Sequence, residues 1–318
     1  MSNRRVAILV PPENPGASAD QADTFLQARE ISECLTILGK EALTVSFGPD
    51  RDDTAALLRR YDPAVVVNLV EDVPEGAEHL HLATALLDRL GLRHTGAPTA
   101  ALAALGDKRH VKAVLLEAHL PTPTQAAGPN GRLIVKSATE HASIGIDATS
   151  VVMGDGAAAR LVSERQARFG GAWFAEAYIE GREFNVGVLE TAKGPIVLPI
   201  AEIHFLDAIG APRIVGYAEK WATESAAYAN TPRRFPEGAA DRPLLDELGG
   251  LALAAWRLFG LAGYARLDFR VDEAGTPFIV DVNANPCLAR DASFCAAAAR
   301  LGLSQTDIVA QLIEAALA

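Results

Sequence analysis

Apolar runs and amphipathic stretches alternate along the first third of the chain. Short runs rich in Val, Leu and Ile are separated by segments with helical spacing, which is typical of a parallel sheet with helices on its faces. The strands expected here are 4–10, 42–47 and 64–70, and the helices are about 18–38, 54–60 and 77–90. This pattern predicts an N-terminal domain over residues 1–96.

The pattern changes near Pro98. Asp107 stands where a helix over 108–118 needs an N-cap, and the segment LPTP ends that helix. The elements expected after it are strands at 132–137 and 146–152 and a helix at about 157–169. They predict a central subdomain over residues 97–171.

Strands dominate the third part, which we expect over residues 172–318. The elements expected there are strands at 173–179, 183–189 and 195–203, a helix at 241–261 and a last amphipathic helix at 305–317. A long polar and Pro-containing connection, 223–243, lies between them. Connections of this length are usually functional or mobile.

Two alternating segments near the C-terminus, 264–271 and 277–282, flank the turn EAGT and predict an antiparallel hairpin. Asp268, Asp281 and Asn283 lie among apolar residues of this hairpin, and cross-strand pairing would bring their oxygens together. Buried acids need a partner, and three hard oxygen ligands suit Mg²⁺. Taken alone, the segment is also compatible with an ordinary exposed hairpin whose acids are solvated.

Composition is that of a soluble globular protein. The chain has 318 residues, 49% hydrophobic and 22% charged, which is enough for two or three compact units. A net charge of −11 argues against nucleic acid or an anionic membrane as the main partner. Three cysteines without a CxxC pair, and no apolar signal segment, indicate a reducing cytoplasm. No apolar run approaches membrane-spanning length.

Other nucleotide and metal motifs have little support. GxxxxGK[ST], HExxH, paired CxxC and GxSxG are absent from the sequence. GDGAAA at 154–159 fits a relaxed dinucleotide pattern, but the better βαβ unit lies at the N-terminus and GDG is more simply a turn. Phosphate binding must therefore come from isolated lysines.

Seven segments, in order, resemble the ATP-grasp ligases, and within them the D-alanine–D-alanine ligases. These segments are 65–76, 91–97, 107–123, 133–146, 176–189, 216–221 and the terminal motif 264–286. The resemblance covers nearly the whole chain. It implies an α/β ATP-grasp fold, in which an N-terminal parallel-sheet domain precedes two α+β units that enclose the nucleotide.

The resemblance also implies the residues that bind ATP. Its lysines are expected at the phosphates, with a covering loop around SATEHASIG, and its acids at the adenine amino group and the ribose hydroxyls. The matching positions are Lys108, Lys136, Ser143, Glu176, Tyr178, Ile179, Glu183 and Lys220. Without the resemblance, each of these lysines and glutamates would be interpreted as a solvated surface residue.

The implied chemistry is transfer of the γ-phosphoryl group of ATP to a carboxylate, followed by attack of an amine on the acyl phosphate. Arg266 matches the arginine that stabilises the oxyanion, and Asp20, in the segment SAD, matches the acid that orients the ammonium of the first amino acid. Asp268, Asp281 and Asn283 match the ligands of Mg²⁺, with Mn²⁺ as an alternative ion. A salt-bridged surface arginine is the other interpretation of Arg266.

Departures from the family leave the substrates open. Asp281 stands where glutamate is usual, Cys287 replaces a glycine, and Ala292, followed by Ser293, replaces a serine that holds the second substrate. D-alanine is one candidate for a ligase of two amino acids. A dipeptide-type ligase of specialised metabolism and an inactive nucleotide-binding regulatory protein are the alternatives. The expected partners are small amino acids or amines and, by resemblance, a second copy of the chain.

Overall fold

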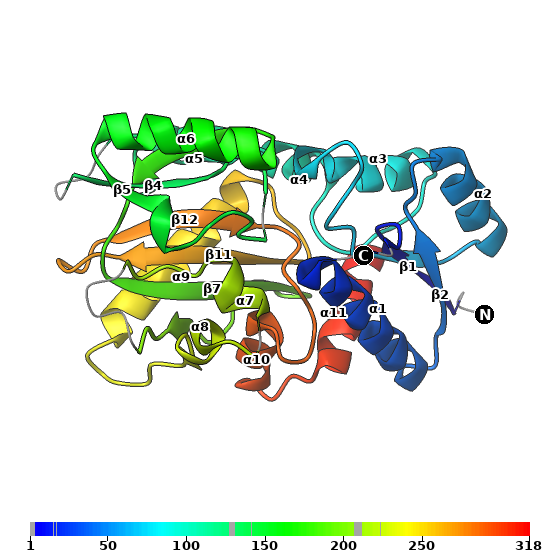
Figure 1. Cartoon of the computed structure of the whole chain (residues 1–318). Helices are drawn as coiled ribbons and strands as arrows, with labels where there is room; N and C mark the ends of the chain where they lie inside the picture. Colours follow the sequence, from blue (N-terminus) through cyan, green and yellow to red (C-terminus); the bar gives the residue numbers. More distant parts are fainter. Residues whose placement is uncertain are drawn as a thin grey trace.

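The strands in the described part of the chain form three β-sheets (Figure 1). A parallel sheet has the strand order β2-β1-β3, a second sheet has the order β5-β4-β6, and a six-stranded sheet has the path β10-β9-β7-β11-β12 with β8 paired to β7. The computed structural model describes all residues except 1–3, 15, 17, 127–130, 141, 207–211 and 223. Residue 223, at the start of the long polar connection, therefore lies outside the described residues.

The N-terminal sheet separates two cores. Successive side chains of its middle strand, β1, point to opposite faces, so that Val6 and Ile8 pack with α1 and α11 whereas Ala7 and Leu9 pack with α2 and α3. The elements are β1 (Arg5–Val10), α1 (Ala19–Ile37), β2 (Glu41–Ser46), α2 (Arg51–Tyr61), β3 (Val65–Asn68), η1 (Ala77–His79) and α3 (His81–Arg89). The expected parallel sheet with helices on its faces is confirmed.

The small sheet is covered by one helix. Leu133 and Val135 of β4 pack with Trp173 of β6 and Ala158 of α6. The elements are β4 (Arg132–Ser137), η2 (Ala148–Ser150), β5 (Val151–Met153), α6 (Asp155–Phe169) and β6 (Trp173–Ala177). The strand expected from residue 146 begins only at Val151, because Asp147 caps a short turn of 3₁₀ helix instead.

The six-stranded sheet packs one face against helices from two parts of the sequence. The elements are α4 (Thr99–Leu105), α5 (Lys108–Glu117), β7 (Arg182–Thr191), β8 (Gly194–Val197), β9 (Ala201–Ile203), α7 (Tyr217–Trp221), α8 (Ala226–Ala229), β10 (Arg233–Arg234), α9 (Arg242–Leu258), β11 (Tyr264–Val271), β12 (Pro277–Asn283), α10 (Ser293–Ala299) and α11 (Gln305–Leu317). Helices α4, α5 and α9 share a core with β7, β11 and β12. The prediction of a single strand at 195–203 is wrong. This segment forms two strands, β8 and β9, because Pro199 between them has no N–H to donate to a β-ladder.

Alternation along β11 gives this sheet a polar face. Leu267 and Phe269 lie in the core, and Arg266, Asp268 and Arg270 point the other way into a cavity. The register of β11 with β12 shifts between Asp268 and Phe269. This bulge is a local irregularity of the ladder at the place where the polar side chains gather.

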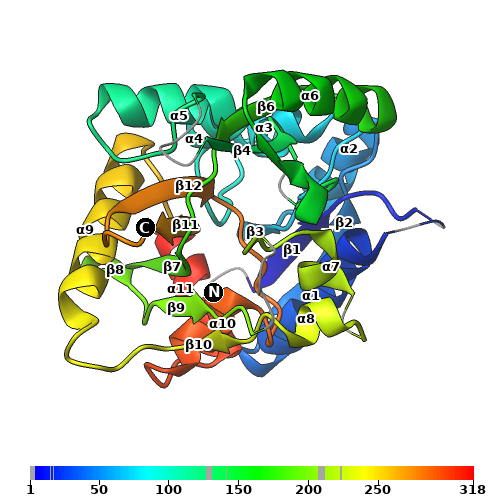
Figure 2. The same cartoon turned by 60° about the vertical axis from the view of Figure 1, so that its left-hand side comes forward.

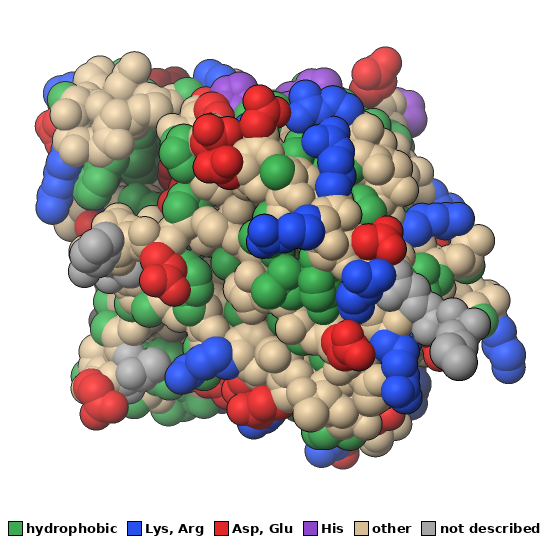
Figure 3. All heavy atoms as spheres, turned by 90° about the vertical axis from the view of Figure 1, so that its right-hand side faces the viewer, with side chains coloured by type: hydrophobic (Ala, Val, Ile, Leu, Met, Phe, Trp, Pro, Cys, Tyr) green, Lys and Arg blue, Asp and Glu red, His purple; other side chains and the backbone are tan. Residues whose placement is uncertain are grey.

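The surface of the N-terminal unit is mixed in charge. On the face seen in Figure 3, acidic and basic side chains are interspersed among the described residues rather than collected by sign. No helix within the described part of the chain is long and apolar enough to cross a membrane.

Candidate active site

A cavity of about 1120 Å³ opens where the three sheets meet. Its walls come from the small sheet on one side, from β11 and β12 on another, and from α1 and the segment around α7 at its end. Figure 2 shows how these elements are arranged. All thirteen residues to which the sequence assigns a role line this cavity: Asp20, Lys108, Lys136, Ser143, Glu176, Tyr178, Ile179, Glu183, Lys220, Arg266, Asp268, Asp281 and Asn283.

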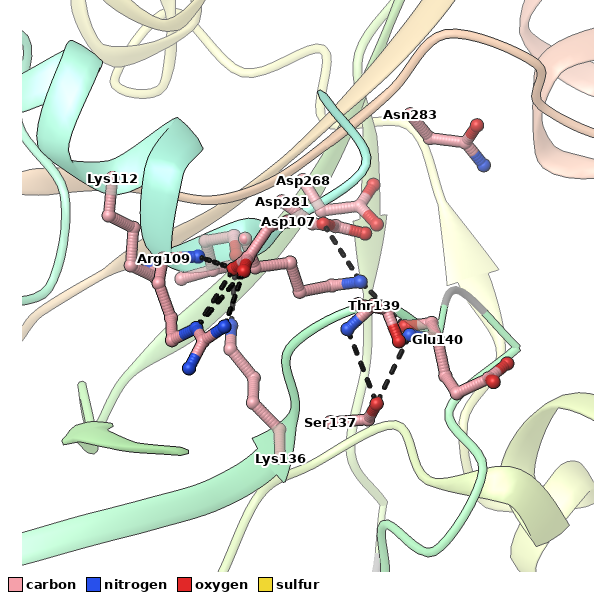
Figure 4. Close-up of polar contacts among 12 residues, drawn as sticks. Asp107, Arg109, Lys112, Lys136, Ser137, Thr139, Glu140, Asp268, Asp281 and Asn283 are labelled. Carbon is pink, nitrogen blue, oxygen red and sulfur yellow. Dashed lines mark hydrogen bonds and ion pairs between the residues drawn. The ribbon is translucent and has the colours of Figure 1, made fainter. Parts of the chain in front are cut away.

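The hairpin β11–β12 forms the polar floor of the cavity. Asp268 lies directly opposite Asp281, and Arg266 lies opposite Asn283. Figure 4 shows the carboxylates of Asp268 and Asp281 side by side, with the amide of Asn283 further along the strand. Two carboxylates and one amide oxygen are hard donors on one surface, and Mg²⁺ needs few protein ligands because phosphate oxygens and water complete its shell. The residues present therefore fit the ion that the sequence predicts.

Asp268 is held by its neighbours. The Arg266 guanidinium donates to both of its oxygens, from Nε at 2.8 Å and from Nη2 at 2.9 Å, and the Asn185 amide donates to Oδ1 at 2.8 Å. Although burial disfavours the charged form of Arg266, its pairing with Asp268 raises the pKa of the guanidinium. A permanent positive charge is thus fixed beside the carboxylate pair.

Lys108 reaches the floor from the opposite wall. Asp107 caps α5 by accepting a 2.8 Å hydrogen bond from the Arg109 N–H, as the sequence predicts, and this places Lys108 in the first turn of the helix. The Lys108 ammonium lies 3.9 Å from Asp281 Oδ1 and donates to the Glu140 carbonyl at 2.5 Å. Burial lowers the pKa of Lys108, and Asp281 opposes this shift.

A buried trio of charges lies at the cavity wall that is expected to hold the nucleotide. The Lys136 ammonium lies 2.6 Å from Glu176 Oε1, and the Lys112 ammonium lies 2.6 Å from Glu176 Oε2. All three residues are almost fully buried. Lys136 also donates to the Val280 carbonyl at 3.0 Å, at the place where the bulge leaves this carbonyl out of the β11–β12 pairing. Burial lowers the pKa of Lys112 to about 8.

Sequence reasoning missed Lys112. The available signal was its spacing of four residues from Lys108, which places both lysines on the same face of α5. That face also carries the buried Val111 and Leu115, so a lysine there needs a buried partner.

The residues expected to hold adenine and ribose lie around a second arginine, Arg270, which the sequence reasoning also missed. Arg270 donates from Nε to the Ile179 carbonyl and from Nη1 to Glu183, each at 3.0 Å. Burial raises the pKa of Glu183 and Arg270 opposes the shift. The turn that joins these residues is tight, because a Cβ on Gly181 would lie 2.0 Å from the Val271 carbonyl. Arg270 thus connects the two ends of the stretch expected to hold adenine and ribose.

The segment 212–222 covers the cavity, and we call it the cover segment. Its contacts reach the connection between β4 and β5. There the Ser143 hydroxyl donates to the Val215 carbonyl at 3.2 Å, and the Trp221 indole donates to the Ala142 carbonyl at 3.0 Å. Arg213 N–H donates to the Tyr178 hydroxyl at 2.8 Å. The cover segment also carries Lys220, whose pKa is lowered by burial and by Arg266.

The end of the cavity that carries Asp20 is acidic, and we call it the amino-acid end because the first amino acid is expected there. Asp20 accepts a 2.8 Å hydrogen bond from the Tyr217 hydroxyl of the cover segment. The Cys287 thiol donates to Asp23 at 3.0 Å, and Gln27 donates to Glu71 at 3.2 Å. Burial raises the pKa of Glu71 to about 7. The thiol that replaces the family's glycine is therefore engaged in a hydrogen bond to a carboxylate.

Comparison with known proteins shows the family to which this chain is similar. Residues 129–314 match the family model described as D-ala D-ala ligase C-terminus. The chain is 27% identical to D-alanine–D-alanine ligase of Moorella thermoacetica, over 95% of this chain and 97% of the relative, and 30% identical to that of Anaeromyxobacter sp. over 73% of each.

Solved structures have the same fold. The crystal structure of D-alanine–D-alanine ligase from Bacillus anthracis complexed with ATP superposes with a TM-score of 0.74 at 18% identity, covering 99% of this chain and 97% of that one. The α/β ATP-grasp fold and the resemblance expected from the sequence are both confirmed. Because the family model matches more than half of this chain, the chain belongs to the D-alanine–D-alanine ligase family.

Proposed function

We propose that this protein is an ATP-dependent carboxylate–amine ligase that joins two molecules of D-alanine and releases ADP and phosphate. The observation that carries the proposal is the polar floor of the cavity. There, Arg266, Asp268 and Asp281 face the same space as two buried lysines, Lys108 and Lys136. A protein that only binds a nucleotide has no need of the arginine. The substrates come from the relatives, which carry the name of this enzyme over most of the chain.

Phosphoryl transfer is the first step. ATP supplies the γ-phosphoryl group, and Mg²⁺ neutralises its charge when bound. Asp268, Asp281 and Asn283 would hold the ion, and Lys108 and Lys136 would bind phosphate oxygens from the facing wall. An oxygen of the first substrate's carboxylate forms a bond to the γ-phosphorus as the bond to ADP breaks, which yields an acyl phosphate. Asp20 orients the ammonium of this substrate so that the carboxylate points to the floor.

Amide formation is the second step. The amine of the second substrate forms a bond to the acyl carbon, the carbon–oxygen bond to phosphate breaks, and the amine loses a proton. Negative charge develops on the carbonyl oxygen during this step, and Arg266 is a permanent cation fixed beside Asp268, one of the proposed metal ligands. The cover segment excludes water, which would otherwise hydrolyse the acyl phosphate.

The nucleotide is recognised at the far end of the cavity. Glu176 is expected at the adenine amino group, the backbone at Tyr178 and Ile179 at the ring edge, and Glu183 at the ribose hydroxyls. Because Arg270 holds both the Ile179 carbonyl and the Glu183 carboxylate, it fixes the distance between these positions. Ser143 and Lys220 would close over the phosphates from the covering side.

The alternatives are not favoured. The fold is compatible with a specialised dipeptide ligase and with an inactive regulatory protein. However, the relatives compared above are D-alanine–D-alanine ligases, and Arg266, the proposed catalytic arginine, is present. A homodimer, a cytoplasmic location and the lack of nucleic-acid or membrane partners stay predictions.

Product analysis tests the proposal. The purified protein is incubated with ATP, Mg²⁺ and D-alanine, the nucleotide is separated by chromatography, and the dipeptide is identified by mass spectrometry. We expect D-alanine-dependent ADP and D-alanyl-D-alanine in equal amounts. AMP as the main nucleotide product would overturn the acyl-phosphate mechanism. ADP that forms only with another pair of amino acids, found by screening pairs, would overturn D-alanine as the substrate.

A further inference from the structure

An arginine outside the family motifs faces the amino-acid end of the cavity. The short strand β10 consists of Arg233 and Arg234, which point to opposite sides because successive side chains of a strand alternate. Arg234 turns away from the cavity and donates to Glu202 at 3.0 Å, and Glu202 also pairs with Arg182 at 2.8 Å. Arg233 lines the cavity. Arg233 lies inside the site and Arg234 outside it, so that Arg234 can serve as a control for Arg233.

Arg233 is anchored but keeps donors to spare. Its Nη2 donates to the Asp291 main-chain carbonyl at 2.8 Å, which ties β10 to the segment that leads into α10. A guanidinium has five N–H donors, and within the described part of the chain Arg233 forms no ion pair with a carboxylate. The side chain is partly buried. Burial lowers the pKa of Arg233; Tyr228 and Asp291 oppose this shift, and Arg266 adds to it. The site thus holds a cation that its own carboxylates do not neutralise by direct contact.

The neighbouring side chains cannot replace it as donors. Ala292 has no polar atom, and the Ser293 hydroxyl is committed to Asn185 Oδ1 at 3.1 Å. Asn185 in turn donates to Asp268, so that this serine belongs to the polar floor. At the wall formed by 291–293, Arg233 is the side chain with N–H groups available to a ligand.

We propose that Arg233 binds the carboxylate of the second amino acid, the substrate whose amine attacks the acyl phosphate. This assignment rests on the proposed function. A planar guanidinium binds a carboxylate through two parallel hydrogen bonds, which fixes orientation as well as position. With its carboxylate on Arg233, at the wall beside Asp291, the amine of the substrate points toward the floor at Arg266 and Asp268. The ligase then selects acceptors that carry an α-carboxylate over simple amines.

Charge complementarity supports the same orientation. The first amino acid presents its ammonium to the acidic end, where Asp20, Asp23 and Glu71 line the cavity. Arg233 is held at the Asp291 carbonyl, and its positive charge attracts the carboxylate of the second amino acid, whereas the acids attract the ammonium of the first. Two zwitterions can therefore bind in one cavity with the reacting carboxylate and the reacting amine facing each other.

Competition between two acceptors tests this assignment. ATP, Mg²⁺, D-alanine and D-alaninamide are given together, and mass spectrometry measures the ratio of D-alanyl-D-alanine to D-alanyl-D-alaninamide. Both products arise from the same acyl phosphate, so their ratio does not depend on the amount of folded protein or on the phosphoryl-transfer step. For Arg233→Met we expect this acid-to-amide ratio to fall at least about 10-fold. Arg233→Lys, which keeps the charge and loses the planar pair of donors, should give an intermediate ratio.

Arg234→Met is the matched control, because Glu202 keeps its pairing with Arg182 in that variant. Its acid-to-amide ratio should equal that of the wild type. An unchanged ratio in Arg233→Met, or an equal fall in Arg234→Met, would overturn the role of Arg233. If Arg233→Met does not fold, an unchanged ratio in Arg233→Lys has the same meaning. Absence of any D-alanyl product from the wild type would instead overturn the proposed function, and this assignment with it.

Discussion

The Tyr217 hydroxyl donates a 2.8 Å hydrogen bond to the Asp20 carboxylate and so joins α7 to the first turn of α1. These residues are 197 positions apart, and the contact closes the cover segment over the amino-acid end of the cavity. The carboxylate that is proposed to orient the first substrate is therefore itself oriented by the cover. Under this proposal, the Asp20 carboxylate takes part both in closing the cavity and in recognising the substrate.

Loss of this hydroxyl should weaken substrate binding. For Tyr217→Phe we expect the KM for the first D-alanine to rise about 5-fold to 10-fold. A hydrogen bond to a charged group contributes about 1.5 to 3 kcal/mol, and partial exposure reduces this value. Steady-state kinetics at saturating ATP measure the effect. Tyr61→Phe is the control, because its hydroxyl also donates a 2.8 Å bond, to the Glu41 carbonyl, away from the cavity. Equal KM values in the two variants would contradict the coupling.

The proposed role of Asp281 as a metal ligand predicts that its substitution strongly lowers catalysis. In Asp281→Asn one negative charge is lost from the carboxylate pair while the size of the side chain is kept. We expect kcat for ADP release to fall at least about 100-fold, because charge stabilisation of this kind is the main catalytic contribution of such sites. The folded state should persist, as measured by circular dichroism and thermal unfolding.

Asp272→Asn is the control for that variant. Asp272 belongs to the same hairpin, but it accepts the Thr276 N–H at 2.8 Å in the turn, and an asparagine oxygen can accept the same bond. Activity of this variant should stay close to that of the wild type. Wild-type-like turnover in Asp281→Asn would remove Asp281 from the metal site.

Local patterns in the sequence sufficed for the elements that depend on neighbouring residues. The hairpin β11–β12 follows from the alternation of polar and apolar residues and from a turn with Gly275, whose φ of 86° favours glycine. Helix α5 begins directly after Asp107, which caps it. The last helix has the bounds expected, Gln305–Leu317. In each case the signal and the structure lie within a few residues of each other. The domain boundaries and the roles of the site residues stay predictions.

Long-range partners explain what the sequence could not predict. No residue near Lys112 in the sequence indicates Glu176 as its partner, because this pair forms only when α5 and β6 come together. Likewise, Arg270 meets Glu183 only when β11 pairs with β7. The strand expected at 146–152 fails for a similar reason. Arg165, from α6, pairs with Asp147 at 3.0 Å and supports the capped turn in place of the strand. Short helices such as α7, with five residues, carry too little periodicity to be recognised.

The buried trio predicts a strong effect of Lys112 on stability. Lys112→Met leaves Glu176 with one lysine instead of two and removes the 3.1 Å bond from Lys112 to the Thr122 hydroxyl. We expect the free energy of unfolding to fall by about 2 to 4 kcal/mol, because a buried carboxylate loses a partner. Urea denaturation measures the loss. The exposed Lys193→Met should have little effect on stability.

A double-mutant cycle separates pairing from packing. In Lys112→Met combined with Glu176→Gln, the carboxylate that lost its partner is neutral, so the double variant should be more stable than the sum of the two single changes indicates. Strict additivity would mean that the 2.6 Å contact contributes through packing alone.

Glu71 predicts how stability depends on pH. Burial raises its pKa from 4.5 to about 7 in the folded protein; Asp23 and Asp20 add to this shift, while the bond from Gln27 and the charge of Arg266 oppose it. Between about pH 4.5 and 7 the folded state holds a proton that the unfolded state has released. The contribution of Glu71 to stability therefore declines as pH rises through this window, and it is constant above it.

Glu71→Gln removes this dependence, and its amide oxygen can still accept the bond from Gln27. The variant should gain stability relative to the wild type as pH rises from 4.5 to 8, and the gain should reach the order of 1 to 3 kcal/mol. Thermal unfolding of both proteins across this range measures the difference in Tm. Glu273→Gln, at an exposed position of the β11–β12 turn, serves as the control and should show a difference that does not change with pH. A Tm difference for Glu71→Gln that is equally flat would show that the carboxyl group is ionised over the whole range, in spite of its burial and the nearby charges of Asp23 and Asp20.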